Sequence, residues 1–206
     1  EMLRAIGNGE MPDFTGKNVS VIGGGNVAMD CTRSAVRLGA KTVTCVYRRR
    51  QEDMTAQAEE VEGAIAEGAA MLTLHAPLKI EVDGEGKCAA LWAQPQIIGE
   101  VDKAGRPRPN TASVDPVRIP ADVVIVAIGQ GIEYQTFEAA GLKVKRGGTI
   151  VADTLTKTGM EGVFSGGDCV TGPATVIRAI AAGKAAAANI DEYLGFHHEI
   201  KVDVEV

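Results

Sequence analysis

The sequence predicts an α/β protein with a Rossmann-like parallel sheet, an antiparallel meander and part of a second domain. Strands and helices alternate over the first 75 residues, which implies parallel strands joined by right-handed crossovers. Helical periodicity is then lost between residues 78 and 119. A second glycine-rich turn, at residues 166 and 167, precedes a long alanine-rich helix.

The first strand and helix follow from the spacing of apolar residues. Residues 2–6 are typical of the end of a helix, and the apolar run at residues 19–22 is typical of a buried strand. Apolar residues recur at helical spacing over residues 26–38, and Gly39 follows in the position that glycine favours after a helix. A second strand is expected at residues 42–47.

The middle of the chain changes from helix-linked strands to short β-like runs. A helix over residues 56–67 and a strand over residues 71–74 complete the alternating pattern. Residues 78–119 contain short apolar runs separated by turn residues, which predicts a small antiparallel meander. The continuous apolar run at residues 123–128 is typical of a strand covered on both faces.

The C-terminal third predicts short elements before one long helix. We expect a short helix near residues 134–140, a strand pair near residues 143–152 and a strand at residues 163–165. Residues 174–194 predict a helix with apolar side chains along one face.

Composition limits the classes of function. The 206 residues include 45% hydrophobic and 23% charged residues, which indicates a globular chain. The net charge of −6 argues against nucleic acid as the main partner. Apolar runs fall far short of the roughly 20 residues that span a bilayer, and no secretion signal opens the chain, so we expect a cytoplasmic protein without a membrane partner.

Neither a metal centre nor a catalytic side-chain set is expected. The four cysteines are isolated, with no Cys-x-x-Cys pair, and are expected to be reduced thiols. No nucleophile with a neighbouring base, and no paired carboxylates, stand out.

The turn after the first strand predicts a dinucleotide site. Gly23-x-Gly25-x-x-Ala28 lies between a predicted strand and a predicted helix. In this motif the first glycine makes the tight turn, the second lets the backbone approach a pyrophosphate, and the third small residue lets helix and strand pack closely. The N-terminus of the helix then faces the phosphates with free N–H groups and a positive dipole end.

The end of the second strand favours NADP over NAD. An NAD site usually places an acidic residue there, about 20 residues after the glycines. This chain has Tyr47-Arg48-Arg49-Arg50, whose guanidinium groups suit a 2′-phosphate. Arg48 and Arg49 are the better candidates, because Arg50 lies furthest from the strand. A merely solvated basic turn is the alternative.

Four sequence stretches, in order, carry a family resemblance. They are VIGGGNVAMD at residues 21–30, VYRR at 46–49, VIVAIGQ at 124–130 and GVFSGGDCVTGP at 162–173. From about residue 16 to residue 194 the chain resembles the C-terminal part of the small (beta) subunit of NADPH-dependent glutamate synthases and their relatives. These belong to the glutathione-reductase-like flavoproteins, in which an NADPH domain is inserted into an FAD domain.

The resemblance implies roles for individual residues. It assigns the 2′-phosphate to Arg48 and Arg49, and it puts Gly129 at the crossing between domains, close to the nicotinamide. It assigns the NADPH pyrophosphate to Gly23, Gly24, Gly25, Asn26 and Val27. It assigns the ribityl-phosphate part of the flavin to Gly167 and Asp168, and the isoalloxazine ring to Ala174, Thr175 and Val176.

The resemblance also implies a division of the chain. Residues 1–15 would be a linker or remnant of the FAD domain, residues 16–129 the NAD(P)H-binding domain, and residues 130–206 the C-terminal segment of the FAD-binding domain. The family's N-terminal FAD fingerprint and cysteine-rich iron–sulfur segment are absent here. We therefore expect half an FAD site, a colourless chain that is inactive alone, and a homodimer formed through exposed FAD-domain surface.

The expected function is hydride transfer from NADPH to FAD within a larger flavin-dependent oxidoreductase. Its partners would be the missing N-terminal FAD and iron–sulfur part and a larger synthase or electron-acceptor subunit. A ferredoxin-NADP-reductase-like or thioredoxin-reductase-like enzyme is an alternative, although the lack of Cys-x-x-Cys disfavours the thioredoxin type. A non-catalytic dinucleotide-binding module is a third interpretation.

Overall fold

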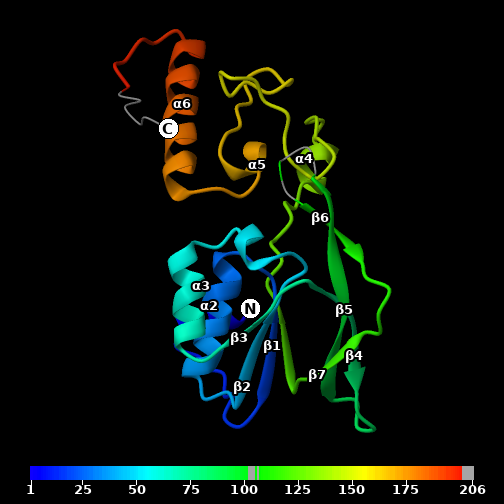
Figure 1. Ribbon diagram of the computed structural model, residues 1–206. Helices are drawn as coiled ribbons and strands as arrows, with labels where there is room; N and C mark the ends of the chain where they lie inside the picture. Colours follow the sequence, from blue (N-terminus) through cyan, green and yellow to red (C-terminus); the bar gives the residue numbers. More distant parts are fainter. Residues whose placement is uncertain (102–104, 106, 201–206) are drawn as a thin grey trace. The chain divides into compact units, whose positions relative to one another are not determined.

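The computed structural model describes residues 1–101, 105 and 107–200, and the chain divides into two compact units (Figure 1). The first unit is Glu1–Gly129 and the second is Gln130–Val206. Residues 1–15 belong to the first unit, where Phe14 is buried in a core and Met2 and Leu3 pack against it.

The first unit contains the alternating strands and helices that the sequence predicts, which confirms the α/β class. Its elements are α1 (Met2–Gly7), β1 (Asn18–Ile22), α2 (Asn26–Arg37), β2 (Thr42–Val46), the short 3-10 helix η1 (Gln51–Asp53), α3 (Ala58–Ala66), β3 (Ala70–Leu72), β4 (His75–Val82), β5 (Cys88–Val101), β6 (Pro107–Thr111), β7 (Val117–Pro120) and β8 (Val123–Val126).

Three layers form the first unit. Its parallel sheet has the strand order β3-β2-β1-β8, with Val21 paired with both Cys45 and Ile125. Helices α2 and α3 lie on one face of this sheet, and the antiparallel strands β4, β5 and β7 lie on the other (Figure 1). One buried core fills the space under the helices, and a smaller one, which includes Val46 and Leu91, lies between the two sheets. The central strands are therefore covered on both faces, as is typical of parallel sheets.

The predicted meander is present, but it is built around one long strand. Strand β5 runs for 14 residues; its first part pairs with β4 and β7, and its last part pairs with β6. The expected series of short runs was wrong at this point, because polar residues and Pro95 interrupt the apolar pattern of β5 without ending it.

Strand β8 is shorter and more exposed than its apolar sequence predicts. Val123 and Ile125 pack against the larger core and Val124 packs against the smaller one, so both faces are covered. The strand nevertheless lies at the edge of the sheet, and Ile128, beyond its end, is 73% exposed.

The second unit contains three helices among its described residues: α4 (Gln135–Ala139), α5 (Asp168–Thr171) and α6 (Val176–Tyr193). The strands expected at residues 143–152 and 163–165 were wrong, since only isolated bridges form there, such as Val144 with Ile150. Within residues 130–200, no strand extends these bridges into a ladder. None of the helices in the described part of the chain has the length and apolar character needed to cross a membrane.

Candidate functional site

A pocket of about 700 Å³ opens in the first unit where β1, β2 and β8 end. Ligands of open α/β sheets bind at these carboxyl ends of the strands. The pocket brings the predicted Gly23–Val27 turn together with Arg48, Arg49 and Gly129. Its described lining residues are Ile22, Gly23, Gly24, Gly25, Asn26, Val27, Val46, Tyr47, Arg48, Arg49, Thr55, Ala76, Pro77, Ala127, Ile128 and Gly129.

The three glycines of the turn are needed for different reasons. A Cβ on Gly23 would collide with the carbonyl oxygen of Ala127, and a Cβ on Gly24 would lie 2.5 Å from the ring of Tyr47. The position of a Cβ on Gly25 has only the Thr55 hydroxyl oxygen near it, at 3.4 Å. Gly23 and Gly24 therefore satisfy the packing of neighbouring strands, and Gly25 leaves backbone open to a ligand.

The start of helix α2 offers free donors to this pocket. Gly25 is the N-cap residue, with an extended backbone at φ −103° and ψ 175°, and none of the described side chains caps the helix. The carbonyl of Gly25 accepts the N–H groups of Ala28 and Met29. The preceding N–H groups lie at the positive end of the helix dipole, where an anion is stabilised.

The arginines after β2 fall into two groups. Arg48 is exposed, while Arg49 is only 9% exposed and donates from Nε to the carbonyl of Pro107 at 2.9 Å. Both line the pocket. Arg50 instead forms ion pairs with Glu52 and Asp53, at 3.0 and 2.9 Å, and these partners raise the pKa of its guanidinium. The side chain of Arg50 therefore binds carboxylates of its own loop, residues 50–53, and does not line the pocket.

A strap, residues 50–57, passes over the glycine turn between β2 and α3. Arg50 holds the carboxylate of Asp53 from Nε and Nη2, at 2.9 and 3.0 Å, and lowers the pKa of that carboxyl. The hydroxyl of Tyr47 donates to the carbonyl of Asp53 at 2.8 Å. The first half of the strap is thus fixed to the end of β2.

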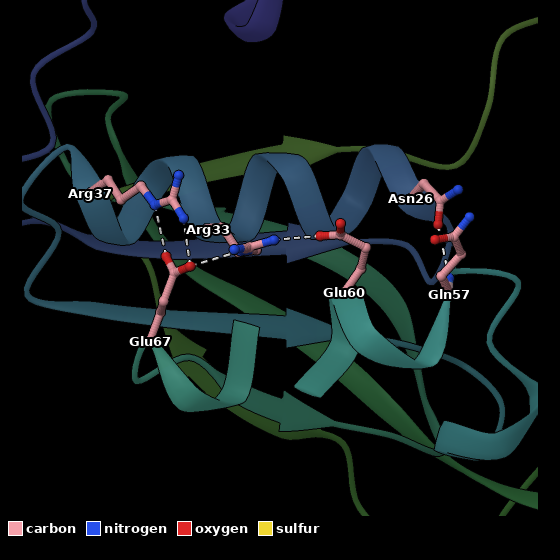
Figure 2. Close-up of polar contacts among 6 residues, drawn as sticks. All are labelled: Asn26, Arg33, Arg37, Gln57, Glu60 and Glu67. Atoms are coloured by element: carbon pink, nitrogen blue, oxygen red, sulfur yellow. Dashed lines mark hydrogen bonds and ion pairs between the residues drawn. The ribbon is translucent and has the colours of Figure 1, made fainter. Parts of the chain in front are cut away.

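The second half of the strap is fixed to the glycine turn itself. The N–H groups of Thr55 and Ala56 donate to the carbonyl of Gly24 at 2.9 and 3.0 Å. The N–H of Gln57 donates to Oδ1 of Asn26 at 2.9 Å, as Figure 2 shows. The Asn26 amide is thereby oriented with its oxygen toward α3.

Ion pairs hold α3 beside α2 and so support the strap (Figure 2). Glu67 accepts from Nε and Nη2 of Arg37 at 2.9 and 2.7 Å and from Nε of Arg33 at 2.8 Å. Arg33 also pairs with Glu60. Hydrogen bonds from Arg37 and then Arg33 lower the pKa of Glu67 to about 2.

In the second unit, hydrogen bonds join the predicted turn to the start of α6. Gly167 is the N-cap of α5, with φ at +75°, and Oδ1 of Asp168 accepts from the N–H of Ala174 at 3.2 Å. The hydroxyl of Thr175 caps α6 by accepting from the N–H of Arg178 at 3.4 Å. Four of the five predicted flavin-site residues are therefore tied into one local structure, and Val176 follows as the first residue of the helix.

The apolar face of α6 is exposed. Val176, Ile177 and Ile180 are 75%, 62% and 52% exposed, and none of the eighteen residues of this fully described helix is buried. Such a face on a soluble helix is usually covered by another element.

Burial disfavours the thiolate form of Cys31 and Cys45, the two cysteines of the first unit's core. Cys45 is buried and donates to the carbonyl of Gly23, and burial raises the pKa of its thiol to about 11. Across residues 1–101, 105 and 107–200, no group of three or more His, Cys, Asp or Glu side chains is arranged to hold a metal ion.

Comparison with known families matches residues 3–183 to the pyridine nucleotide-disulphide oxidoreductases. Two curated proteins illustrate the sequence similarity. The chain is 40% identical over 195 residues to the NADP(+)-dependent formate dehydrogenase subunit beta of Moorella thermoacetica, covering 94% of this chain and 27% of that protein. It is 38% identical over 201 residues to the glutamate synthase [NADPH] small chain of Escherichia coli, covering 92% and 42%. The chain thus spans less than half the length of these relatives.

Solved structures share the fold. The thioredoxin reductase of T. acidophilum matches with a TM-score of 0.69 at 22% identity, over 88% of this chain and 53% of that one. The thioredoxin reductase of Lactococcus lactis matches with a TM-score of 0.70 at 20% identity, over 88% and 54%. At this identity the likeness bears on the fold alone.

Proposed function

The chain belongs to the pyridine nucleotide-disulphide oxidoreductase family, and we propose that its first unit binds NADP(H) and its second unit supplies part of an FAD site. The whole protein would pass hydride from NADPH to FAD. The single observation that carries this proposal is the pocket that unites the glycine turn, the uncapped start of α2 and two arginines.

The open backbone and the charges of the pocket support NADP(H) as its ligand. The diphosphate would lie over Gly25 and the first N–H groups of α2, where backbone is open and the helix dipole is favourable. Arg48 and Arg49 carry the charges among the described lining residues, so a 2′-phosphate would meet cations there. The nicotinamide would lie near Gly129, on the side of the pocket that the residues following β8 form.

The second unit would contribute Gly167, Asp168 and the start of α6 to the flavin-binding site. Asp168 is already held against Ala174, which fixes a carboxylate beside a helix N-terminus. The relatives are more than twice as long as this chain. We propose that, in the whole protein, an N-terminal FAD part covers the exposed face of α6. Without that part we expect two copies of the chain to associate through this face.

The chemistry asks these residues to bind and orient. The nicotinamide supplies a hydride and the flavin accepts it, so that the protein's contribution is to position two rings. No proton donor or acceptor is required at the hydride step. Electrons would then leave through an iron–sulfur segment to a larger synthase or electron-acceptor subunit. The names of the relatives, "subunit beta" and "small chain", agree with such a partner.

Cofactor choice tests the proposal. Calorimetric titration of NADP⁺ and NAD⁺ is compared for the wild-type chain, Arg48→Ala and Arg49→Ala. Each guanidinium would make charge-assisted hydrogen bonds to the 2′-phosphate worth about 1.5–3 kcal/mol, so NADP⁺ binding should weaken about 10- to 100-fold while NAD⁺ binding changes little.

Arg50→Ala is the matched control, because Arg50 pairs with Glu52 and Asp53 and does not line the pocket. It should leave the ratio of NADP⁺ to NAD⁺ affinity unchanged. A wild-type chain that binds NAD⁺ as tightly as NADP⁺ would refute the assignment, as would arginine variants that keep the NADP⁺ preference.

A further inference from the structure

Thr55, a residue of the strap, lines the NADP(H) pocket with its hydroxyl group. Thr55 is exposed, lines the pocket, and places Oγ1 3.4 Å from where a Cβ of Gly25 would be. Among the described residues this hydroxyl has no hydrogen-bond partner, although the backbone N–H of Thr55 is bonded to Gly24. Gly25 thus has an open backbone on one side and a free hydroxyl next to it.

The strap holds this hydroxyl in place without help from a ligand. Four backbone and side-chain groups fix the strap within a few residues of Thr55: the N–H groups of Thr55, Ala56 and Gln57, and the hydroxyl of Tyr47. Two of these bonds end on the carbonyl of Gly24, which is itself part of the phosphate-binding turn. Thr55 is therefore bonded directly to the turn, and a preorganised donor loses little entropy on binding.

We propose that Thr55 is a ligand of the NADP(H) diphosphate, donating its hydroxyl to a phosphate oxygen bound over Gly25. Tyr47 is a positioning residue that acts by holding the strap through Asp53. The proposal rests on the proposed NADP(H) function of the pocket. The nearby charges favour an anion, because the described residues that line the pocket include Arg48 and Arg49 and no carboxylate.

The test separates the diphosphate from the 2′-phosphate. The 206-residue chain is titrated with NADP⁺, and with adenosine 2′-phosphate, which has the 2′-phosphate and no diphosphate. Thr55→Val keeps the side-chain shape and removes the donor, so NADP⁺ should bind about tenfold more weakly. Adenosine 2′-phosphate should bind as it does to the wild type, and Thr55→Ser should restore NADP⁺ affinity.

Thr111→Val, on the exposed surface of β6, is the matched control and should leave both ligands unaffected. Equal weakening of both ligands by Thr55→Val would overturn the proposal, because it would mean that the pocket is distorted. Unchanged NADP⁺ affinity in Thr55→Val would overturn it too. Failure of the wild type to bind NADP⁺ would instead refute the function of the pocket as a whole.

The role of Tyr47 is tested by a double-mutant cycle. Tyr47→Phe removes the hydroxyl that holds Asp53 and keeps the ring that packs on Gly24. It should weaken NADP⁺ binding about two- to threefold in the wild-type chain and have no effect in Thr55→Val. Additive effects would show that Tyr47 does not act through Thr55.

Discussion

Helices α2 and α6 both follow a glycine-rich turn, and yet the chain buries one and leaves the other exposed. Five of the twelve residues of α2 are buried, among them Met29 and Ala35 at 0% exposure. In α6, whose eighteen residues are all described, none is buried. The turn chemistry is similar, and the difference comes from what lies beneath each helix.

Helix α2 packs on a four-stranded parallel sheet made within the same unit. The turn before α6 is preceded by residues that form isolated bridges only. A glycine turn can therefore be encoded locally, while a cofactor pocket also needs neighbouring strands to supply its other walls. By this comparison the pocket of the first unit has walls from several strands, and we propose that the second unit supplies only one side of a site.

The largest expected difference in stability comes from truncating one apolar side chain in each helix to alanine. Met29→Ala should lower the free energy of unfolding of the first unit by about 3 kcal/mol, because it leaves a cavity in a fully buried site. Ile180→Ala, at a 52% exposed position, should stay within about 0.5 kcal/mol. Urea unfolding followed by Trp92 fluorescence reports the first unit, and circular dichroism reports the helices of both units, of which α6 is the longest. Equal destabilisation would mean that α6 is packed as α2 is.

The turn glycines give a smaller contrast. Gly23→Ala should cost about 2–3 kcal/mol, because the new Cβ collides with the Ala127 carbonyl. Gly167→Ala should cost about 1–2 kcal/mol, since its φ of +75° and ψ of −153° strain an L residue but the nearest atoms would be 3.8 Å away. The same unfolding curves measure both. A larger cost at Gly167 would contradict the view that only the first turn is enclosed.

The smallest effect concerns the ion pairs between α2 and α3. The pKa of Glu67 is about 2 in the folded protein and near 4.5 in the unfolded chain. The contribution of Glu67 to stability is therefore complete above pH 4.5 and is lost as the pH falls through 2. Wild-type stability, followed by Trp92 fluorescence from pH 6 to pH 2, should therefore fall more steeply than that of Glu67→Gln.

Glu62→Gln, at an exposed position of α3, the helix that ends just before Glu67, is the control for this pH series and should follow the wild type. If Glu67→Gln loses stability as steeply as the wild type, the ion pairs do not hold α3 in place.

The sequence predicted the first unit well because its signals are local. Apolar periodicity, Gly39 after α2 and the Gly23–Ala28 motif each depend on neighbouring residues. The helices α1, α2 and α3 and the four strands of the parallel sheet formed within a few residues of their expected bounds. The pocket then followed from parallel topology, which places the ends of β1, β2 and β8 at one edge.

Long-range contacts account for what the sequence did not predict. Thr55 lines the pocket because the strap bonds to Gly24 and Asn26, and no spacing rule marks residue 55. The bond from Arg49 to Pro107 joins segments far apart in the chain. Helix α5 was also missed, since four residues between glycines give no periodic signal.

The central claim is that this chain contains a complete NADP(H) pocket and only part of an FAD site. Parallel calorimetric titrations of the purified chain with NADP⁺ and with FAD test it most directly. We predict that NADP⁺ saturates a single site per chain, that FAD does not saturate, and that the protein is colourless as purified. Tight stoichiometric FAD binding, or no binding of NADP⁺, would contradict the account.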